Sequence, residues 1–243
     1  MPIIKLNAID STNSYLKELC SKNSMEDYTT VVAKFQTKGR GQMGTSWQVE
    51  GGKNLTCSVF KHTSSISVEE SFSISIVTSL AIIAVLRSFN IPKLYVKWPN
   101  DILSEDKKIC GILIENVIKN NNLEASIIGI GLNVNQTQFK NLPKASSLKI
   151  IKGQLFDLDE LVQHILKKLE YYFDRLEKLG YDQLRQDYES LLFRKDKPSS
   201  FKDKQQRIFP GFIKGIDRSG NLKVLLEDDI LRSYDLKDIE LLY

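Results

Sequence analysis

The chain has 243 residues, of which 42% are apolar and 26% charged, and its formal net charge is +4. This size and composition predict a globular protein with one large domain, or one large and one small domain, and a core of useful size. The mild positive charge permits phosphorylated ligands or an acidic partner, but it does not by itself indicate nucleic-acid binding.

Helices and strands alternate in the first half of the chain. Capping residues, β-branched runs and period-two alternation predict a helix from Ser11 or Thr12 to about Cys20, strands at 29–35 and 54–60, and a helix at 69–90 that ends before Pro92. The most apolar part of that last helix, 74–89, is interrupted by serine, threonine and arginine. It is therefore expected to be a buried helix and not a membrane span, and we expect no membrane contact.

The second half of the chain predicts a hairpin followed by two helices. The elements expected in order are strands at 94–98, 108–118 and 124–134, a helix from 157 to 179, and a helix at about 181–192. A turn at 120–122 should join the last two strands as an antiparallel hairpin. Asp157 with Glu160 resembles a capping pair at the start of the longer helix, and Gly180 resembles its stop.

Composition changes at RKDKPSS, residues 194–200. The short alternating segments beyond it, with a turn at 217–221, predict a small all-β barrel of the SH3-like type. The predicted fold class is α+β, with a mixed sheet flanked by helices followed by this barrel. The expected domains are residues 1–193 and 194–243.

A glycine-rich segment at 35–47, FQTKGRGQMGTSW, contains GRGQMG, which fits the pattern G-x-G-x-x-G. A dinucleotide-binding fold needs a helix directly after these glycines, because the helix N-terminus holds the pyrophosphate. Here Gly51 and Gly52 break any helix and a strand follows, while Thr45 stands where a P-loop needs lysine. Glycine N–H groups together with Arg40 instead predict an anion clamp of another type.

Five motifs stand in order along the chain. They are DSTN at 10–13, QTKGRGQMGTSW at 36–47, KWPNDI at 97–102, KKICGILIEN at 107–116 and GIGLNVN at 129–135. Together they resemble the biotin protein ligases, also called biotin–acetyl-CoA-carboxylase ligases, over about residues 5–135. One such motif would be weak, but five in order with the family's spacing form a specific pattern.

The resemblance implies a two-step reaction in which biotin and ATP, with Mg²⁺, form biotinyl-5′-AMP and pyrophosphate. A lysine ε-amine of a biotin carboxyl carrier protein then attacks the adenylate. The implied fold is the class II synthetase-like fold of biotin and lipoate ligases with a small SH3-like domain, which agrees with the pattern above. Three cysteines without a CxxC pair, and no signal-peptide pattern, favour a cytoplasmic protein.

The expected catalytic residues follow from motif matches and from the need to bring two anions together. Lys108 matches the family's essential lysine and is expected between the biotin carboxylate and the α-phosphate. Arg40 matches the loop arginine that closes over the adenylate. Lys97 is expected to face phosphates and Asp101 to help hold Mg²⁺. Cations fixed in place would stabilise the transition state.

The remaining expected ligand contacts come from the same matches. The biotin-binding set is Ser11, Thr12, Gln36, Gly39, Arg40 and Gly111. The nucleotide-binding set is Trp47, which would cover the adenine, with Lys97, Asn100 and Asn133. Several of these residues have purely structural alternatives: a helix cap for Ser11, core packing for Trp47 and a turn for Asn100.

Two departures from the family's pattern affect the interpretation. Bifunctional members carry an N-terminal DNA-binding domain, and this chain starts almost at the DSTN motif, so we expect a monofunctional ligase with no DNA partner. The loop also departs from the arginine-rich form GRGRRGR, with Gln42, Met43 and Thr45 in place of arginines. Either the adenylate is held less tightly or another cation substitutes.

The alternative enzyme is a lipoate or octanoate ligase or transferase, which shares the fold and a catalytic lysine; KWPND with GRG…W favours biotin. The alternative from another class is a nucleotide- or RNA-binding module, against which the C-terminal segments show no cluster of stacking aromatics among lysines. Monomer and homodimer both stay open, and the apolar strand at 124–134 would suit pairing through a sheet edge.

Overall fold

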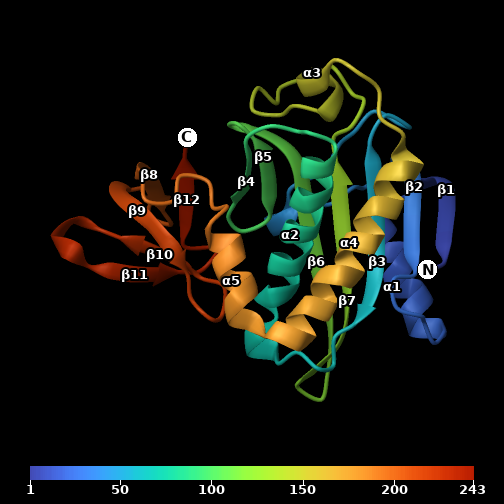
Figure 1. The fold of residues 1–243 in the computed structure, drawn as a ribbon, viewed down its shortest axis with the longest axis horizontal. Coiled ribbons are helices and arrows are strands. Elements are labelled where there is room, and N and C mark those ends of the chain that lie inside the picture. The colour runs from blue at the N-terminus through green and yellow to red at the C-terminus, as the bar shows by residue number, and fades with distance from the viewer.

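A mixed seven-stranded sheet forms the larger part of the computed structural model, which describes all of residues 1–243 (Figure 1). The strand order is β1-β2-β3-β7-β6-β5-β4. The strands are β1 (Ile3–Ile9), β2 (Thr30–Gln36), β3 (Leu55–His62), β4 (Leu94–Lys97), β5 (Asp101–Ser104), β6 (Lys107–Lys119) and β7 (Asn122–Leu132). Only β1 and β2 are parallel, and every other neighbouring pair is antiparallel.

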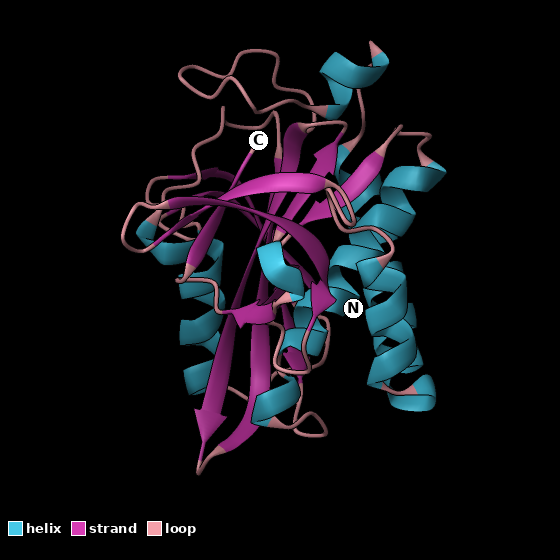
Figure 2. Ribbon diagram, turned by 90° about the vertical axis from the view of Figure 1, so that its left-hand side faces the viewer, coloured by secondary structure: helices cyan, strands magenta, loops and turns pink.

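Helices cover both faces of this sheet (Figure 2). Helix α1 (Thr12–Lys22) lies on one face, and α2 (Phe72–Ser88) and α4 (Leu158–Leu179) lie on the other. Helix α5 (Tyr181–Glu189) packs against α2, and the short α3 (Leu148–Lys152) lies beyond the ends of the strands (Figure 1). Adjacent residues of β7 point to opposite faces, so Ile128 joins the main core under α2 and α4, while Ile127 joins a smaller cluster under α1. Burial on both faces explains why β7 is apolar almost throughout.

The predicted buried helix is confirmed as α2. The segment Val68–Ser88 is long and apolar enough to cross a membrane by length and composition, but 67% of its apolar 18-residue window is buried inside the protein. It packs between the sheet and helices α4 and α5 (Figure 1). Its apolar surface is therefore already covered by the fold, as expected for the core helix of a globular domain.

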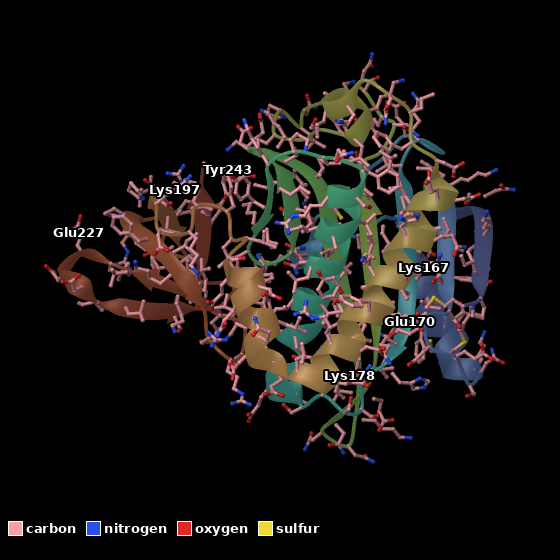
Figure 3. All side chains as sticks on the ribbon, in the orientation of Figure 1. Lys167, Glu170, Lys178, Lys197, Glu227 and Tyr243 are labelled. Atoms are coloured by element: carbon pink, nitrogen blue, oxygen red, sulfur yellow. The ribbon has the colours of Figure 1, made fainter.

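Helix α4 begins and ends where its sequence indicates. The side chain of Asp157 accepts hydrogen bonds from the backbone N–H groups of Asp159 (2.7 Å) and Glu160 (3.0 Å). Gly180, with φ of 78°, ends the helix. Its outward side carries charged residues, among them Lys167, Glu170 and Lys178 (Figure 3).

A second sheet of five strands follows, in the order β11-β10-β9-β8-β12, and all its neighbouring pairs are antiparallel. Its strands are β8 (Pro198–Asp203), β9 (Ile208–Ile216), β10 (Leu222–Leu225), β11 (Leu231–Tyr234) and β12 (Ile239–Leu242). This agrees with the predicted small all-β unit. The indole N–H of Trp98 donates to the carbonyl of Gly220 (2.9 Å) and ties the two sheets together.

Three features of the fold differ from the sequence-based expectations. Strands β1 and β5 and the short helix α3 were not predicted, and β1 forms through parallel pairing with β2 across the intervening α1. The idea that the apolar strand at 124–134 forms a sheet edge is wrong, because β7 lies between β3 and β6. The two edges of the first sheet are β1 and β4.

Candidate functional site

A cavity of about 590 Å³ lies where the glycine-rich loop, the first sheet and the second sheet meet. Its volume is in the range of roughly 300–1,000 Å³ usual for small-molecule sites. The start of α1, the end of β4, the start of β5, the first half of β6 and the last part of β7 contribute to its wall. Residues of the second sheet, including Lys202, Lys204 and Lys237, line the same cavity.

Two glycines form a flat part of the cavity wall. Gly111 of β6 and Gly131 of β7 are register partners on neighbouring strands. The indole of Trp47 lies over them, since a Cβ placed on Gly131 would be 2.6 Å from its Nε1 and one on Gly111 would be 3.0 Å from its Cζ3. The buried Nε1 of Trp47 has no hydrogen-bond partner. A side chain at either glycine would displace the ring.

A carboxylate between two lysines stands at the end of β4 and the start of β5. Lys97 and Asp101 are register partners, with Nζ of Lys97 3.9 Å from Oδ2 of Asp101. Nζ of Lys108 lies 2.6 Å from Oδ1 of Asp101. Burial lowers the pKa of Lys97, the nearby charges of Lys108 and Lys144 act in the same direction, and Asp101 opposes them.

A β-bulge turns Lys108 toward the cavity. The register between β5 and β6 shifts so that Ile102 faces Cys110 while Leu103 faces Lys108, which leaves Ile109 as the extra residue. Ile109 and Cys110 are both fully buried in the core. Lys108 therefore shares the cavity face with Gly111, and the prediction that Cys110 is a packed core thiol is confirmed.

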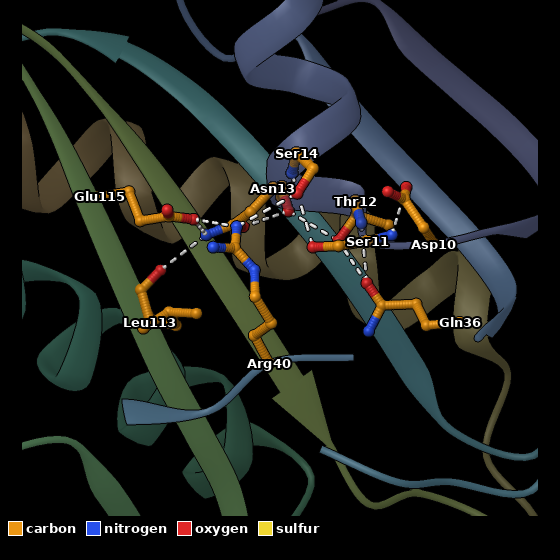
Figure 4. Close-up of polar contacts among 10 residues, drawn as sticks. Asp10, Ser11, Thr12, Asn13, Ser14, Gln36, Arg40, Leu113 and Glu115 are labelled. Atoms are coloured by element: carbon orange, nitrogen blue, oxygen red, sulfur yellow. Dashed lines mark hydrogen bonds and ion pairs between the residues drawn. The ribbon is translucent and has the colours of Figure 1, made fainter. Parts of the chain in front are cut away.

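Arg40 lines the cavity, and its side chain extends from the glycine-rich loop to Glu115 of β6 (Figure 4). One guanidinium nitrogen lies 2.8 Å from Oε2 of Glu115 and donates to the hydroxyl of Ser14 at 3.2 Å. The amide of Asn13 donates to the same Glu115 oxygen at 2.7 Å. The guanidinium is thus fixed against β6 and the start of α1.

Polar side chains at the start of α1 and the end of β2 form the polar end of the cavity, and Figure 4 shows their contacts. The side-chain oxygen of Gln36 accepts from the backbone N–H (2.7 Å) and the hydroxyl (3.1 Å) of Thr12. The hydroxyl of Ser58 lies 2.7 Å from the hydroxyl oxygen of Thr12 and 2.5 Å from the amide oxygen of Asn13, and it can donate to either. Ser11 caps α1 and also lines the cavity, so it has the structural role and is available to a ligand.

The other predicted site residues are placed differently. Asn100 lines the cavity and donates to the carbonyl of Ile112 at 2.6 Å. Gly39 lies just outside the lining and lets the loop pass close to Gln36, whose Nε2 would be 2.9 Å from a Cβ there. Asn133 is buried away from the cavity, where its amide donates to the carbonyl of Ser146 at 3.0 Å.

The donor set at Asp101 does not fit a metal ion held by the protein. Both carboxylate oxygens lie within ion-pair distance of a lysine, and the chain has no group of three histidine, cysteine, aspartate or glutamate residues that could hold a metal. Mg²⁺ in nucleotide sites is bound by one or two carboxylates together with phosphates and water. Two ammonium groups beside a single carboxylate would repel such an ion.

Three polar residues of the site were missed by the sequence reasoning. Glu115 lies four residues after Gly111 on β6, and Ser58 lies two residues after Thr56 on β3, so strand alternation could have placed both on the cavity face. Asn13 stands within the DSTN motif. The lysines of the second sheet had no comparable sequence signal.

Comparison with known proteins identifies the family. The profile of the biotin/lipoate A/B protein ligase family matches residues 6–133, just over half of the chain. The chain belongs to this family. Its matched region contains β2 to β7 and the second half of β1, and therefore reaches every strand of the first sheet.

Individual members of the biotin/lipoate A/B protein ligase family are similar over more of the chain. The bifunctional ligase/repressor BirA of Bacillus spizizenii is 33% identical over 169 residues, which cover 68% of this chain and 51% of that protein. The biotin–[acetyl-CoA-carboxylase] ligase of Mycobacterium tuberculosis is 28% identical over 163 residues, 66% of this chain and 59% of that protein. The chain thus spans between half and two thirds of the length of these two relatives.

A solved structure shows the same fold over the whole chain. The biotin protein ligase of Aquifex aeolicus, in complex with biotin and ATP, superposes with a TM-score of 0.83 and covers 99% of this chain and 98% of its own, at 24% identity. This likeness includes the second sheet. The predicted α+β architecture of the biotin/lipoate ligase family is therefore confirmed.

Proposed function

We propose that this protein is a biotin protein ligase, which joins biotin to ATP and then transfers it to a lysine of a biotin carboxyl carrier protein. The observation that carries the proposal is the placement of Lys108 and Lys97 around Asp101 in the cavity where the two sheets and the glycine-rich loop meet. Two relatives are named biotin–[acetyl-CoA-carboxylase] ligases, and these names support biotin over lipoate and an enzyme over a nucleotide- or RNA-binding module.

In the first step an oxygen of the biotin carboxylate would attack the α-phosphorus of ATP, and the bond to the bridging oxygen would break with release of pyrophosphate. Both reactants are anions, so the step needs cations that are fixed before the reaction. Asp101 orients Nζ of Lys108 at 2.6 Å. We assign to Lys108 the place between carboxylate and α-phosphate, and to Lys97 the outer phosphates.

In the second step the ε-amine of the carrier lysine would attack the carbonyl carbon of the mixed anhydride. A C–N bond forms, the C–O bond to AMP breaks, and the amine loses a proton. AMP leaves as a phosphate monoester whose charge the same two lysines would stabilise. The name of the Mycobacterium tuberculosis relative supports a carboxylase carrier subunit as the acceptor.

The polar end of the cavity supports the biotin-binding assignments. The ureido group of biotin has two N–H donors and one acceptor, and hydroxyls of Ser11 and Thr12 with the amide of Gln36 line that end. We place the ureido group there; because the indole of Trp47 covers Gly111, the bicyclic ring would contact this glycine only after the indole moves aside. The free N–H of Trp47 supports a position for this side chain beside the adenylate.

We propose that lysines of the second sheet supply the positive charges that the glycine-rich loop lacks. The loop residues Gln42, Met43 and Thr45 line the cavity without a charge. Lys202 and Lys204 are paired with Glu240 (2.8 Å) and Asp238 (2.5 Å), but Lys237 is exposed and has no carboxylate within 4.0 Å. These contacts favour substitution by another cation over weaker retention of the adenylate.

The remaining assignments are proposals of the same kind. Mg²⁺ would enter bound to the phosphates of ATP and belong to that substrate. We divide the chain into a catalytic domain of residues 1–193 and an SH3-like domain of residues 194–243, supported by the separate sheets. The three cysteines are free, which supports a reducing cytoplasmic location.

The test is ATP–pyrophosphate exchange by the purified protein with Mg²⁺ and with biotin, lipoate or neither. We expect exchange with biotin only. Lys108→Ala should abolish it, whereas Lys107→Ala should keep it, because the neighbouring Nζ of Lys107 donates to the carbonyl of Pro143 and lies outside the cavity. Exchange with lipoate alone would move the activity to lipoate ligation. Loss in both lysine variants would contradict the role given to Lys108.

A further inference from the structure

The last residue of the chain reaches back from the second sheet to the first. Tyr243 follows β12, and its ring lies 5.2 Å from that of Phe193 at an interplanar angle of 70°. Figure 3 shows Tyr243 where the second sheet faces the rest of the protein. Phe193 is in turn tied to β4, because its N–H donates to the carbonyl of Val96 at 2.8 Å.

Two ammonium groups lie against this ring. Nζ of Lys144 is 3.8 Å and Nζ of Lys97 is 5.0 Å from the ring centroid. Cations within about 6 Å of an aromatic centroid are attracted to its face, and the attraction grows when the cation is withdrawn from water. The side chain of Lys97 is only 23% exposed.

Lys97 has few other supports. Its distance of 3.9 Å from Asp101 is near the outer limit of an ion pair, and the same carboxylate lies much closer to Lys108. Burial also lowers the pKa of Lys97, which disfavours its charged form. The ring of Tyr243 is therefore a major part of what holds this ammonium at the cavity.

We propose that Tyr243 is a positioning residue for Lys97, so that the C-terminal residue of the second sheet sets the affinity of the cavity for the phosphates of ATP. The inference rests on the proposed adenylation function. It gives the second sheet a defined part in the site, which acts through a ring face and not through the tyrosine hydroxyl. Phenylalanine at position 243 should therefore preserve the ATP affinity, whereas an aliphatic side chain there should lower it.

The experiment compares the wild-type protein with Tyr243→Phe, Tyr243→Leu, Lys97→Ala and the double variant Lys97→Ala/Tyr243→Leu. Exchange is measured at saturating biotin over a range of ATP, and ATP binding is titrated calorimetrically without biotin. Thermal unfolding confirms that each variant is folded. The expected loss of ATP affinity for Tyr243→Leu is about 2- to 10-fold, from the usual strength of such contacts.

Tyr243→Phe should match the wild type, the KM for biotin should stay unchanged, and Tyr243→Leu should add nothing once Lys97 is alanine. If the wild type catalyses exchange and Tyr243→Leu binds ATP with the same affinity as the wild type, the inference is overturned and the proposed function stays intact. So would an effect of Tyr243→Leu that persists in the Lys97→Ala background. A wild type that neither binds ATP nor catalyses exchange would overturn the proposed function and this inference together.

Discussion

A methyl group at Gly131 would test whether the glycine pair supports the indole of Trp47. The Cβ of Gly131→Ala would stand 2.6 Å from Nε1 and 2.7 Å from Cζ2 of Trp47, closer than carbon and nitrogen atoms pack. The neighbouring atoms are ring atoms on a loop and not backbone of the sheet. The ring must therefore move away from the floor of the cavity.

The expected loss in the free energy of unfolding follows from the surface area that the Trp47 side chain buries. A tryptophan side chain buries roughly 150–250 Å². If the methyl group removes about half of this contact, about 100 Å² at ~25 cal/mol per Å² corresponds to about 2.5 kcal/mol. Alanine recovers about 0.4–1 kcal/mol by restricting the unfolded chain. The net loss is about 1.5–2 kcal/mol, which lowers Tm by about 3–8 °C for a chain of this size.

The assay is thermal unfolding together with tryptophan emission, in a Trp98→Phe background because the chain has 2 tryptophans. Gly131→Ala should lower Tm and shift the emission of Trp47 toward that of an exposed indole. Gly51→Ala is the matched control, since its Cβ would be 3.7 Å from the Phe35 side chain, an ordinary contact. Unchanged emission and Tm in Gly131→Ala would refute the placement of the indole on the glycines.

Two further predictions concern charge. Asp101→Asn keeps the shape but removes the only carboxylate within 4.0 Å of Lys108 and Lys97. Biotin-dependent exchange should therefore fall about 10-fold, taking the low end for a charged contact that is partly exposed. An unchanged rate would contradict the orienting role. Burial raises the pKa of the Cys57 thiol from 9.0 to about 12, so stability should be lost as pH rises between these values, where only the unfolded chain releases the proton. Cys57→Ala should flatten this fall in urea midpoints measured under reducing conditions, and an identical slope in both proteins would disprove it.

The parts of the fold that could be predicted are those with local signals. Helix α4 has a capping aspartate, an amphipathic pattern and a glycine stop, and all three are in the structure as expected. Strand β1 has no such signal, because its partner β2 lies more than twenty residues away and its edge position leaves it partly polar. Pairing that depends on distant parts of the chain cannot be read from a short window.

In the candidate site, too, residues with a local sequence signal could be predicted and residues brought in by tertiary packing could not. The motifs identified the residues of the first sheet, and the structure brings Lys97, Asp101 and Lys108 together. They gave no information on Lys237 or Tyr243, which reach the site only because the second sheet docks beside β4. Surface lysines in a small β unit have no pattern of their own. Their relevance arises from tertiary packing.

The orientation of Lys108 is the clearest case in which alternation alone misleads. In a regular strand Lys108 and Cys110 would share a face, and a lysine would point into the core beside a buried thiol. The extra residue Ile109 prevents this. Its carbonyl accepts from the N–H of Asn133 at 2.8 Å, and the flanking loop bonds both backbone groups of Lys108, to Lys144 and to Ser146.

Asn133 holds that loop through Ser146, so its place is behind the bulge and not in the cavity. Bulges are common where a strand must redirect a side chain beside a binding site. The motif that contains Asn133 and the motif that contains Lys108 are therefore coupled by backbone bonds across the bulge. Asn133, which the family pattern matches to the nucleotide, here bonds the strand that presents Lys108, and this is a structural reason for the two motifs to occur together.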